Sequence, residues 1–177
     1  MTQLVALLRG VNVGRANRIA MADFRGLLHD LGYGSPRTLL QSGNAIFEAT
    51  KAQAAKAGPR IEAALKSHGV TSKVLIRTGD QVREAIDADP FTTISTDESR
   101  HFLGFLADKP TKDAESAVHA LDDGNDRIRI IGTHVYLWMP EGLMESTLTK
   151  AKWERLLGTE VTARNFNTVT KLAALLS

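Results

Sequence analysis

The stretch Thr38-Leu-Leu-Gln-Ser-Gly-Asn-Ala-Ile-Phe47 contains two strand-like segments joined by a polar turn. Thr38 to Leu40 and Ala45 to Phe47 have the composition of strands, and Gln41-Ser42-Gly43-Asn44 between them consists of residues typical of turns. Hairpins of this kind occur in many folds. The elements on its two sides therefore decide which fold is predicted.

The flanking segments complete an alternation of strands and helices within residues 1–79. Gln3 to Val11 is a short apolar run of strand length, and apolar residues then recur at spacings of three and four until Gly32, which indicates a helix face. After the hairpin, Gly58-Pro59 is expected to break an Ala/Lys-rich segment ahead of a second helix, and Ser72 to Arg77 has strand character. The order β-α-β-β-α-β predicts a ferredoxin-like subdomain. The two helical faces consist of Met21, Phe24, Leu27, Leu28 and Leu31, and of Ile61, Ala64 and Leu65.

Residues 80–177 repeat this order. Thr78 and Gln81 have the spacing of a capping box that opens a helix, which Asp89-Pro90 ends. The predicted fold class is α+β, with two tandem ferredoxin-like β-α-β-β-α-β subdomains, residues 1–79 and 80–177, plus a C-terminal helix that Asn167 is placed to cap. The later elements are a strand (101–106), a helix (114–121), a hairpin (127–131 and 134–138), a helix (144–157) and a strand (160–163).

Composition excludes several classes of protein. The 177 residues are 43% hydrophobic and 24% charged, which is enough for a packed core and unlike a disordered tail. The absence of Cys excludes a disulfide framework, thiol catalysis and Cys-based zinc sites, and is in keeping with a reducing cytosol. No stretch approaches the roughly 18 apolar residues that span a membrane, and no signal-peptide pattern opens the chain. We therefore expect a soluble, cytoplasmic protein without a membrane partner.

Charge is distributed unevenly, although the net charge is only +2. Residues 1–79 contain 11 Lys and Arg against 4 Asp and Glu, a net charge of +7, and residues 80–177 contain 11 against 16, a net charge of −5. Opposite charges let the two halves attract each other or a second copy of the chain, so a homodimer is compatible with the sequence. Alternatively, the basic half meets an anionic partner.

Four segments carry a family resemblance: Ala6-Leu-Leu-Arg-Gly-Val-Asn-Val-Gly14, Arg37 to Phe47 centred on Gln41-Ser-Gly-Asn44, Val135-Tyr-Leu-Trp-Met-Pro140, and Arg164-Asn-Phe-Asn-Thr-Val169 followed by Lys171-Leu172. In their order and separation they resemble the bacterial family catalogued as domain of unknown function 1697. The resemblance extends from Leu4 to Leu176, nearly the whole chain.

The resemblance implies a fold of tandem α/β subdomains and implies no assigned biochemical function. Two departures from the family's pattern bear on ligand binding. The usual paired Gly after the Asn-Val step is Gly14-Arg15 here, and a basic Gly-Arg-Ser-Lys-like stretch after Pro140 is replaced by Glu141 to Leu148. If that basic stretch binds an anion in other members, this chain lacks the contact. The last motif carries Phe166 where Trp is common.

The predicted topology brings the first two motifs to one edge of the first sheet. In the strand order 4-1-3-2, the loop after the first strand and the hairpin after the second emerge together, beside the start of a helix. Exposed backbone N–H groups, the helix dipole and Arg side chains favour an anion there. We predict an anionic or phosphate-bearing ligand, namely a nucleotide, a phosphate ester or a nucleic acid. The candidate ligand-binding residues are Arg9, Asn12, Gly14, Arg15, Asn17, Gln41, Ser42 and Asn44, with Arg164, Asn165 and Asn167 from the last motif.

Two other classes of function stay open. Asn tolerates left-handed backbone and bonds its own main chain, so the motifs could build turns in a structural or oligomerisation module without a small ligand. A metal-independent enzyme using the same polar cluster is the other alternative, although Ser42 lacks the Gly flanks of a nucleophile elbow and no His lies in a catalytic signature. No cofactor or metal site is predicted, since no His, Asp and Glu have ligand spacing. The residues Asp122, Asp123 and Asp126 are interpreted as an acidic turn.

A nucleic-acid partner has limited further support. Tyr136, Trp138 and Phe166 could stack on bases, and ferredoxin-like sheets do occur in RNA-binding modules. However, the RNA-recognition signature is absent from the chain. The apolar run Val135 to Trp138 more simply predicts a strand buried on both faces or a subunit interface.

Overall fold

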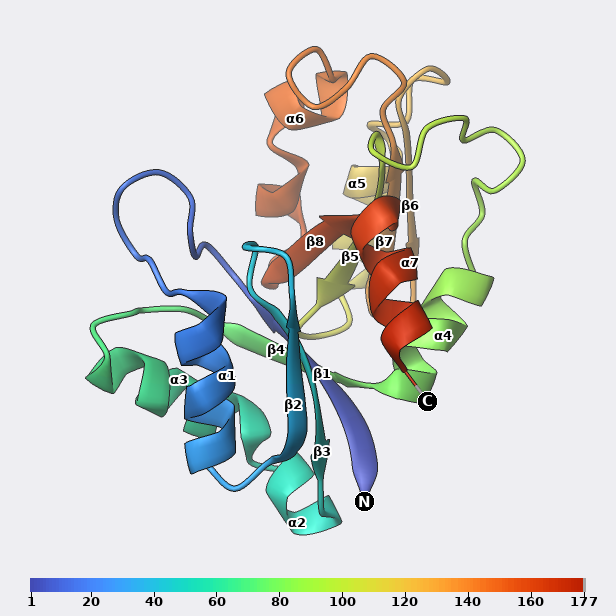
Figure 1. The fold of residues 1–177 in the computed structure, drawn as a ribbon. Helices are drawn as coiled ribbons and strands as arrows, with labels where there is room; N and C mark the ends of the chain where they lie inside the picture. Colours follow the sequence, from blue (N-terminus) through green and yellow to red (C-terminus); the bar gives the residue numbers. More distant parts are fainter. Residues whose placement is uncertain (177) are drawn as a thin grey trace. The chain divides into compact units, whose positions relative to one another are not determined.

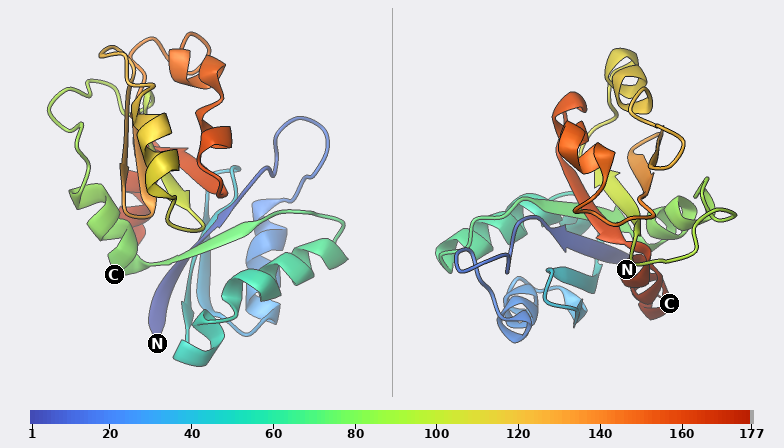
Figure 2. Two further views of the ribbon diagram at one scale, coloured as in Figure 1. Left: turned by 180° about the vertical axis from the view of Figure 1, so that it is seen from behind. Right: turned by 90° about the horizontal axis from the view of Figure 1, so that it is seen from above.

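A computed structural model describes residues 1–176 and divides them into two compact units. The first unit consists of Met1–Arg83 together with the residues from Lys171 onward, and the second of Glu84–Thr170. Each unit contains one four-stranded antiparallel sheet with helices packed on it (Figure 1, Figure 2). The architecture is α+β, with two tandem ferredoxin-like subdomains and a C-terminal helix, as predicted. None of the helices within the described residues has the length and apolar character that a membrane crossing requires.

The first sheet has the strand order β2-β3-β1-β4, in which all neighbours are antiparallel. Two helices, α1 and α3, pack on this sheet (Figure 1). The register places Leu7 opposite Asn44 and Leu8 opposite Val74, so three loops meet beyond the end of β1. The elements are β1 (Thr2–Leu8), α1 (Met21–Asp30), β2 (Gly34–Leu39), β3 (Asn44–Ala49), α2 (Lys51–Ala54), α3 (Ala57–Ser67) and β4 (Val74–Thr78).

Alternate residues of β1 form the centre of the first core. Leu4, Ala6 and Leu8 pack in one cluster with Phe24 of α1 and Ile61 of α3. Val5 and Leu7, on the opposite face of the strand, are also fully buried. A strand buried on both faces requires the continuous apolar run that the sequence shows at Leu4 to Leu8.

The second sheet has the equivalent order β6-β7-β5-β8, again antiparallel throughout. Its core includes Leu106 of β5, Val118 of α5 and Leu137 of β7. The capping box predicted at Thr78 and Gln81 is present, and it opens α4. The elements are α4 (Gly79–Asp87), β5 (His101–Leu106), α5 (Lys112–His119), β6 (Arg127–Ile131), β7 (His134–Trp138), α6 (Thr147–Ala151), the 3-10 helix η1 (Trp153–Leu156), β8 (Val161–Asn165) and α7 (Phe166–Leu175).

The break predicted at Gly58-Pro59 is wrong. Both residues lie in the first turn of α3, and the interruption comes earlier, at Ala55 and Lys56 between α2 and α3. Proline is tolerated in a first turn because its missing N–H has no helical acceptor there.

The single helix predicted over residues 144–157 is also wrong. It is divided into α6 and η1 by Lys152, whose backbone is left-handed at φ 54°. The first turn of α6 starts only at Thr147, where the Ser146 side chain accepts hydrogen bonds from the N–H groups of Leu148 and Thr149. The apolar residues of this stretch do not follow one helical period, which agrees with its division into two short helices.

The cap predicted for the last helix belongs to another residue. The Asn165 side chain accepts from the Thr168 N–H at 3.1 Å and from the Thr168 hydroxyl at 3.0 Å, whereas Asn167 lies exposed inside α7. The helix begins two residues earlier than Asn167 suggests, so the N-cap position falls on Asn165. At the other end of α7, the Arg37 guanidinium donates to the Leu175 carbonyl at 2.6 Å within the first unit.

Candidate functional site

Three loops of the first unit are joined at the end of β1. The Leu8 N–H donates to the carbonyl of Gly43 in the β2–β3 turn at 2.8 Å, and the Arg9 N–H donates to the carbonyl of Lys73 before β4 at 3.0 Å. The end of β1 lies at the same edge as the starts of β3 and β4, because both of these strands run antiparallel to β1. This loop edge comprises residues 9–20, 40–43 and 68–73.

Two asparagines of the first motif connect the loops through their side chains. Asn12 Nδ2 donates to the carbonyls of Ile19 at 2.9 Å and Gln41 at 2.7 Å, while its Oδ1 accepts from the Ile19 N–H. Asn17 Nδ2 donates to the carbonyls of Gly10 and Thr71, both at 2.7 Å, and its Oδ1 accepts from the Thr71 N–H. Both residues have a left-handed backbone at φ 57°, which Asn adopts more readily than most residues. The two side chains therefore act as loop connectors.

The second motif packs tightly against β1. Gly43 has φ +83°, and a Cβ built there would lie 2.7 Å from Leu8 Cβ and 2.7 Å from Val11 Cγ2, so no other residue fits without displacement. Asn44 is fully buried, and its Nδ2 donates to the Leu39 carbonyl at 2.8 Å and to Ser42 Oγ at 2.9 Å. This motif is thus explained by backbone geometry and hydrogen bonding within the turn.

The remaining candidates of these two motifs lie at the surface of the loops. Arg18 donates from Nε and Nη2 to the Gly14 carbonyl at 3.0 and 2.8 Å and closes the β1–α1 loop. Arg15 and Gln41 are exposed, and Gln41 contributes its carbonyl to the bond with Asn12. The polar motifs consequently support the interpretation that they build turns, and a ligand site has to be sought in the space they enclose.

A cavity of about 560 Å³ lies on the β4 side of the loop edge. It includes three residues from the β1–α1 loop, of which Arg9 and Asn17 are predicted ligand-binding residues. The turn residues Gln41, Ser42 and Asn44 are not part of its lining. Its walls are formed by Arg9, Gly10, Asn17, Pro59, Glu62, Ala63, Lys66, Thr71, Ser72 and Lys73.

The lining of this basic cavity is positively charged. It contains the cations Arg9, Lys66 and Lys73 and one carboxylate, Glu62. Glu62 Oε1 accepts from the Val74 N–H at 2.9 Å, and its Oε2 lies 3.7 Å from Lys73 Nζ. Within this lining, three cationic side chains thus face one carboxylate, which is already bonded to the backbone.

The start of α1 does not contribute to the basic cavity. A separate cavity of about 400 Å³ lies there and is lined by Arg18, Asp23, Asp30 and His68, among others. The N-cap residue Ala20 makes no side-chain hydrogen bond to the helix. In the cavity lining, however, the carboxylates of Asp23 and Asp30 offset the positive charge of Arg18. The electrostatic preference for an anion is thus greater at the basic cavity than at this helix start.

The predicted residues of the last motif belong to the second unit. Arg164 lies on β8, where its Nη1 donates to the Ala163 carbonyl at 2.9 Å, and burial lowers its pKa to about 10. This value leaves the guanidinium charged at neutral pH. Asn165 is the α7 cap and Asn167 is exposed. Two of the three residues thus have a local structural role.

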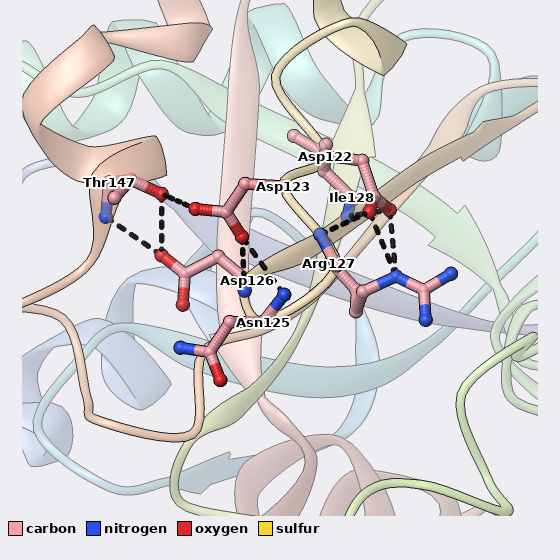
Figure 3. Close-up of polar contacts among 8 residues, drawn as sticks. Asp122, Asp123, Asn125, Asp126, Arg127, Ile128 and Thr147 are labelled. Carbon is pink, nitrogen blue, oxygen red and sulfur yellow. Dashed lines mark hydrogen bonds and ion pairs between the residues drawn. The ribbon is translucent and has the colours of Figure 1, made fainter.

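The acidic turn of the second unit is held by hydrogen bonds (Figure 3). Asp122 accepts from Arg127 Nε and the Ile128 N–H, and Asp126 Oδ2 accepts from the Thr147 N–H at 2.8 Å. Hydrogen bonds from Thr147 and from neighbouring N–H groups lower the pKa of Asp123. Among the described residues, no group of three His, Cys, Asp or Glu side chains could hold a metal ion.

A buried histidine–aspartate pair was not predicted from the sequence. His101 Nε2 lies 3.1 Å from Asp89 Oδ1, with both side chains at most 3% exposed, and the imidazole stacks on Phe166 at 3.9 Å between ring centroids. Asp89 also accepts from the Phe91 N–H at 3.0 Å. The pair attaches the segment after α4 to β5. The two residues are 12 positions apart in the sequence, and no sequence motif predicts that they pair.

Two lysines of the basic cavity were also missed, although the topology contained the signal. Lys66 lies in the last turn of α3, and Lys73 is the last residue of the loop that precedes β4. Since β4 runs antiparallel to β1, that loop had to emerge at the same edge as the β1–α1 loop. The predicted site used only the hairpin on the other side of β1.

Comparisons with known proteins identify the family and the fold. Residues 1–136 match the family described as protein of unknown function (DUF1697), so the chain belongs to this family. None of the curated proteins matches the chain significantly. Among solved structures, the conserved bacterial protein SP0830 from Streptococcus pneumoniae is similar, with 20% sequence identity, a TM-score of 0.72 and 99% of each chain covered. This similarity shows a common fold over the whole chain.

Proposed function

We propose that the protein binds a small anionic metabolite, with a phosphate or carboxylate group, in the basic cavity of its first unit. The single observation that carries this proposal is the placement of Arg9, Lys66 and Lys73 around about 560 Å³ of open volume, in a lining that contains one carboxylate, Glu62. Guanidinium and ammonium groups bind phosphate through charge-assisted hydrogen bonds.

The polar lining offers further donors of suitable kind. Thr71 and Ser72 carry hydroxyl groups, and Asn17 fixes the Thr71 backbone through two hydrogen bonds. A wall held in this way loses little freedom when a ligand binds, which favours affinity.

The size and composition of the cavity favour a small molecule. Its volume lies within the roughly 300–1,000 Å³ typical of ligand sites. Pro59 and Ala63 add a small apolar wall next to the cations. A nucleotide or sugar phosphate, with one anionic end and one less polar end, fits this division, and such a ligand is in keeping with a cytoplasmic role.

Thermal unfolding with inorganic phosphate, pyrophosphate, AMP and a short single-stranded oligonucleotide tests the proposal. A ligand that binds only the folded state raises the melting temperature, by about 2–4 °C for each kcal/mol in a chain of this size. We expect AMP or pyrophosphate to raise it at constant ionic strength, and Arg9→Gln and Lys73→Gln to reduce the rise.

Arg15→Gln provides the matched control, because Arg15 is an exposed cation of the same loop outside the cavity lining. The rise should be retained in this variant. A rise that Arg15→Gln abolishes and Arg9→Gln spares would contradict the proposed site and move binding to the loop tip. No rise with any of the four probes would contradict the proposal itself, and a rise with the oligonucleotide alone would favour nucleic acid as the partner.

A further inference from the structure

A second cavity of about 560 Å³ lies in the second unit, between its sheet and the segment that contains α6 and η1. Phe102, Leu137 and Ala163 project from β5, β7 and β8 toward it. Leu143, Thr149 and Trp153 close the other side. We name this the apolar cavity. Its remaining lining residues are Met139, Lys152, Glu154 and Arg155.

The cavity results from the division of the helix that covers this part of the sheet. The left-handed Lys152 turns the chain between α6 and η1, so the two short helices do not follow one axis. A continuous helix would bring a row of side chains onto Phe102 and Leu137. A left-handed backbone at a residue other than Gly costs free energy, and such strain concentrates at functional sites.

Buried polar contacts hold the start of α6 in this position. Asp126 is only 2% exposed, and its Oδ2 accepts from Ser146 Oγ at 2.6 Å and from the Thr147 N–H at 2.8 Å. The Thr147 hydroxyl also bonds Asp123 Oδ2 at 2.9 Å (Figure 3). These bonds anchor the wall of the cavity, which is therefore a formed feature of the fold.

Charge and apolar surface are segregated around the cavity. The apolar side chains of the sheet and of Trp153, which is 7% exposed, lie on the inner side, and Leu143 is 48% exposed. Lys152 and Arg155 are exposed cations, and Glu154 is the one carboxylate of the lining. An apolar interior with a net positive edge is complementary to a small molecule that has an apolar body and an anionic head.

We propose that the apolar cavity binds a small amphipathic anion, a carboxylate with an aliphatic or aromatic body, whose apolar part packs on Phe102, Leu137 and Trp153. The carboxylate is held by Lys152 and Arg155. The site lies within the second unit and is independent of the basic cavity proposed above.

Fluorescence titration with three probes of equal chain length tests this inference. The chain has two Trp residues, so Trp138→Phe leaves Trp153 as the only tryptophan reporter. Octanoate should change the Trp153 emission in a saturable way, 1-octanol should bind more weakly, and octylammonium should bind weakest. Equilibrium dialysis of octanoate against the native chain repeats the measurement without the substitution.

Three variants separate specific binding from general apolar adsorption. Lys152→Gln together with Arg155→Gln should weaken octanoate binding about fivefold, the effect of two solvent-exposed ion pairs, and leave 1-octanol unchanged. Thr149→Phe introduces a ring at the exposed edge of the cavity and should remove binding of both. Lys150→Gln is the matched control, because Lys150 is an exposed cation of α6 outside the lining.

Several results would overturn the inference. Equal affinity for octanoate and octylammonium would contradict the role of the two cations, as would an equal loss in Lys150→Gln. Absence of saturable octanoate binding in the native chain would contradict the site. A loss of octanoate binding in Arg9→Gln, with none in Thr149→Phe, would assign the probe to the basic cavity instead.

Discussion

The two units have the same topology but differ in the helix between their last two strands. In the first unit the short α2 precedes α3, an uninterrupted helix of 11 residues whose Ile61 and Leu65 are fully buried in the core. In the second unit this element is α6 followed by η1, of 5 and 4 residues, with Lys152 between them. The uninterrupted α3 lines one cavity along Pro59, Glu62, Ala63 and Lys66, beside the loops, whereas the divided segment of α6 and η1 leaves one against the sheet.

The charges follow the same division. Lys66 of α3 and the loop before β4 contribute to a cavity edge with three cations, while the cavity of the second unit has mainly apolar walls. One topology thus forms two kinds of cavity, which differ in the helices that cover the sheet. Four predictions test this comparison, from the largest expected effect to the smallest.

Asp126→Ala should have the largest effect. The substitution leaves the Ser146 hydroxyl and the Thr147 N–H without their carboxylate partner, and we expect the second unit to lose about 3 kcal/mol of stability. Amides of α6 should exchange faster, while those of α3 keep their protection. Asp123→Ala, which alters the same turn at an exposed position, is the control and should cost less. Unchanged exchange in α6 would mean that this network does not hold the divided helix.

Gly104→Ala should be the next most destabilising change. Gly104 of β5 corresponds to Ala6 of β1. Ala6 lies two residues before Leu8, which pairs with the first residue of β4, and Gly104 lies two residues before Leu106, which pairs with the first residue of β8. A Cβ at Gly104 would lie 2.6 Å from Val135 Cγ1 and 2.8 Å from Val161 Cγ2, so overpacking should cost about 1–3 kcal/mol in the second unit.

Ala6→Gly is the reciprocal substitution and should cost about 1 kcal/mol in the first unit. Urea unfolding followed by probes in each unit measures both changes. If Gly104→Ala proves neutral, the close packing of Val135 and Val161 on Gly104 is not a constraint, and the two central strands are interchangeable at this position.

Asn17→Ala should destabilise the loop edge of the first unit by about 2 kcal/mol, because it combines left-handed strain with lost hydrogen bonds. Asn17→Gly retains the backbone freedom and should lose only about half as much, which isolates the contribution of the bonds to Gly10 and Thr71. Thermal unfolding of both variants measures the difference. Equal losses would show that the hydrogen bonds alone account for the asparagine.

The smallest effect concerns pH and the second unit. Burial lowers the pKa of His119 and Arg129 lowers it further, against the smaller opposing influence of Glu115 and Asp122. The neutral ring accepts the Ile130 N–H at Nε2, at 2.9 Å. The folded state therefore binds the proton less readily than the unfolded chain does.

The stabilising contribution of His119 is complete above the ordinary pKa of 6.5 and is lost as the pH falls through the lower pKa of the folded state. Unfolding of the second unit between pH 8 and pH 5 measures it, with these limits chosen about 1.5 units to either side of the ordinary pKa. His119→Gln, which can still accept a hydrogen bond, should flatten the profile. A native profile that is already flat would contradict the contribution.

The order of elements was open to prediction because it depends on local patterns. The apolar spacing of Met21 to Leu28, the capping box at Thr78 and the hairpin around Gly132 each depend on a few neighbouring residues. Two repeats of one order then suffice to predict the strand order, since few topologies connect such elements without crossings.

Local pattern was insufficient where a distant contact decides the outcome. The start of α6 at Thr147 depends on Asp126, which lies 20 residues before Ser146 and accepts from the Ser146 hydroxyl and the Thr147 N–H. Asn165 rather than Asn167 caps α7 because β8 extends to Asn165, a limit that pairing with Phe102 sets.

The sequence by itself determined the α+β class, the two subdomains in tandem, the family and the loops at the end of β1. Only the tertiary structure decided that Asn12 and Asn17 connect those loops and that the cations of the basic cavity come from the β1–α1 loop, from α3 and from the residue before β4. It alone decided that the second unit has an apolar cavity. The physical reason is that periodicity and turn chemistry act over a few residues, whereas a cavity is the space left by side chains from distant segments, and its shape depends on how closely they pack.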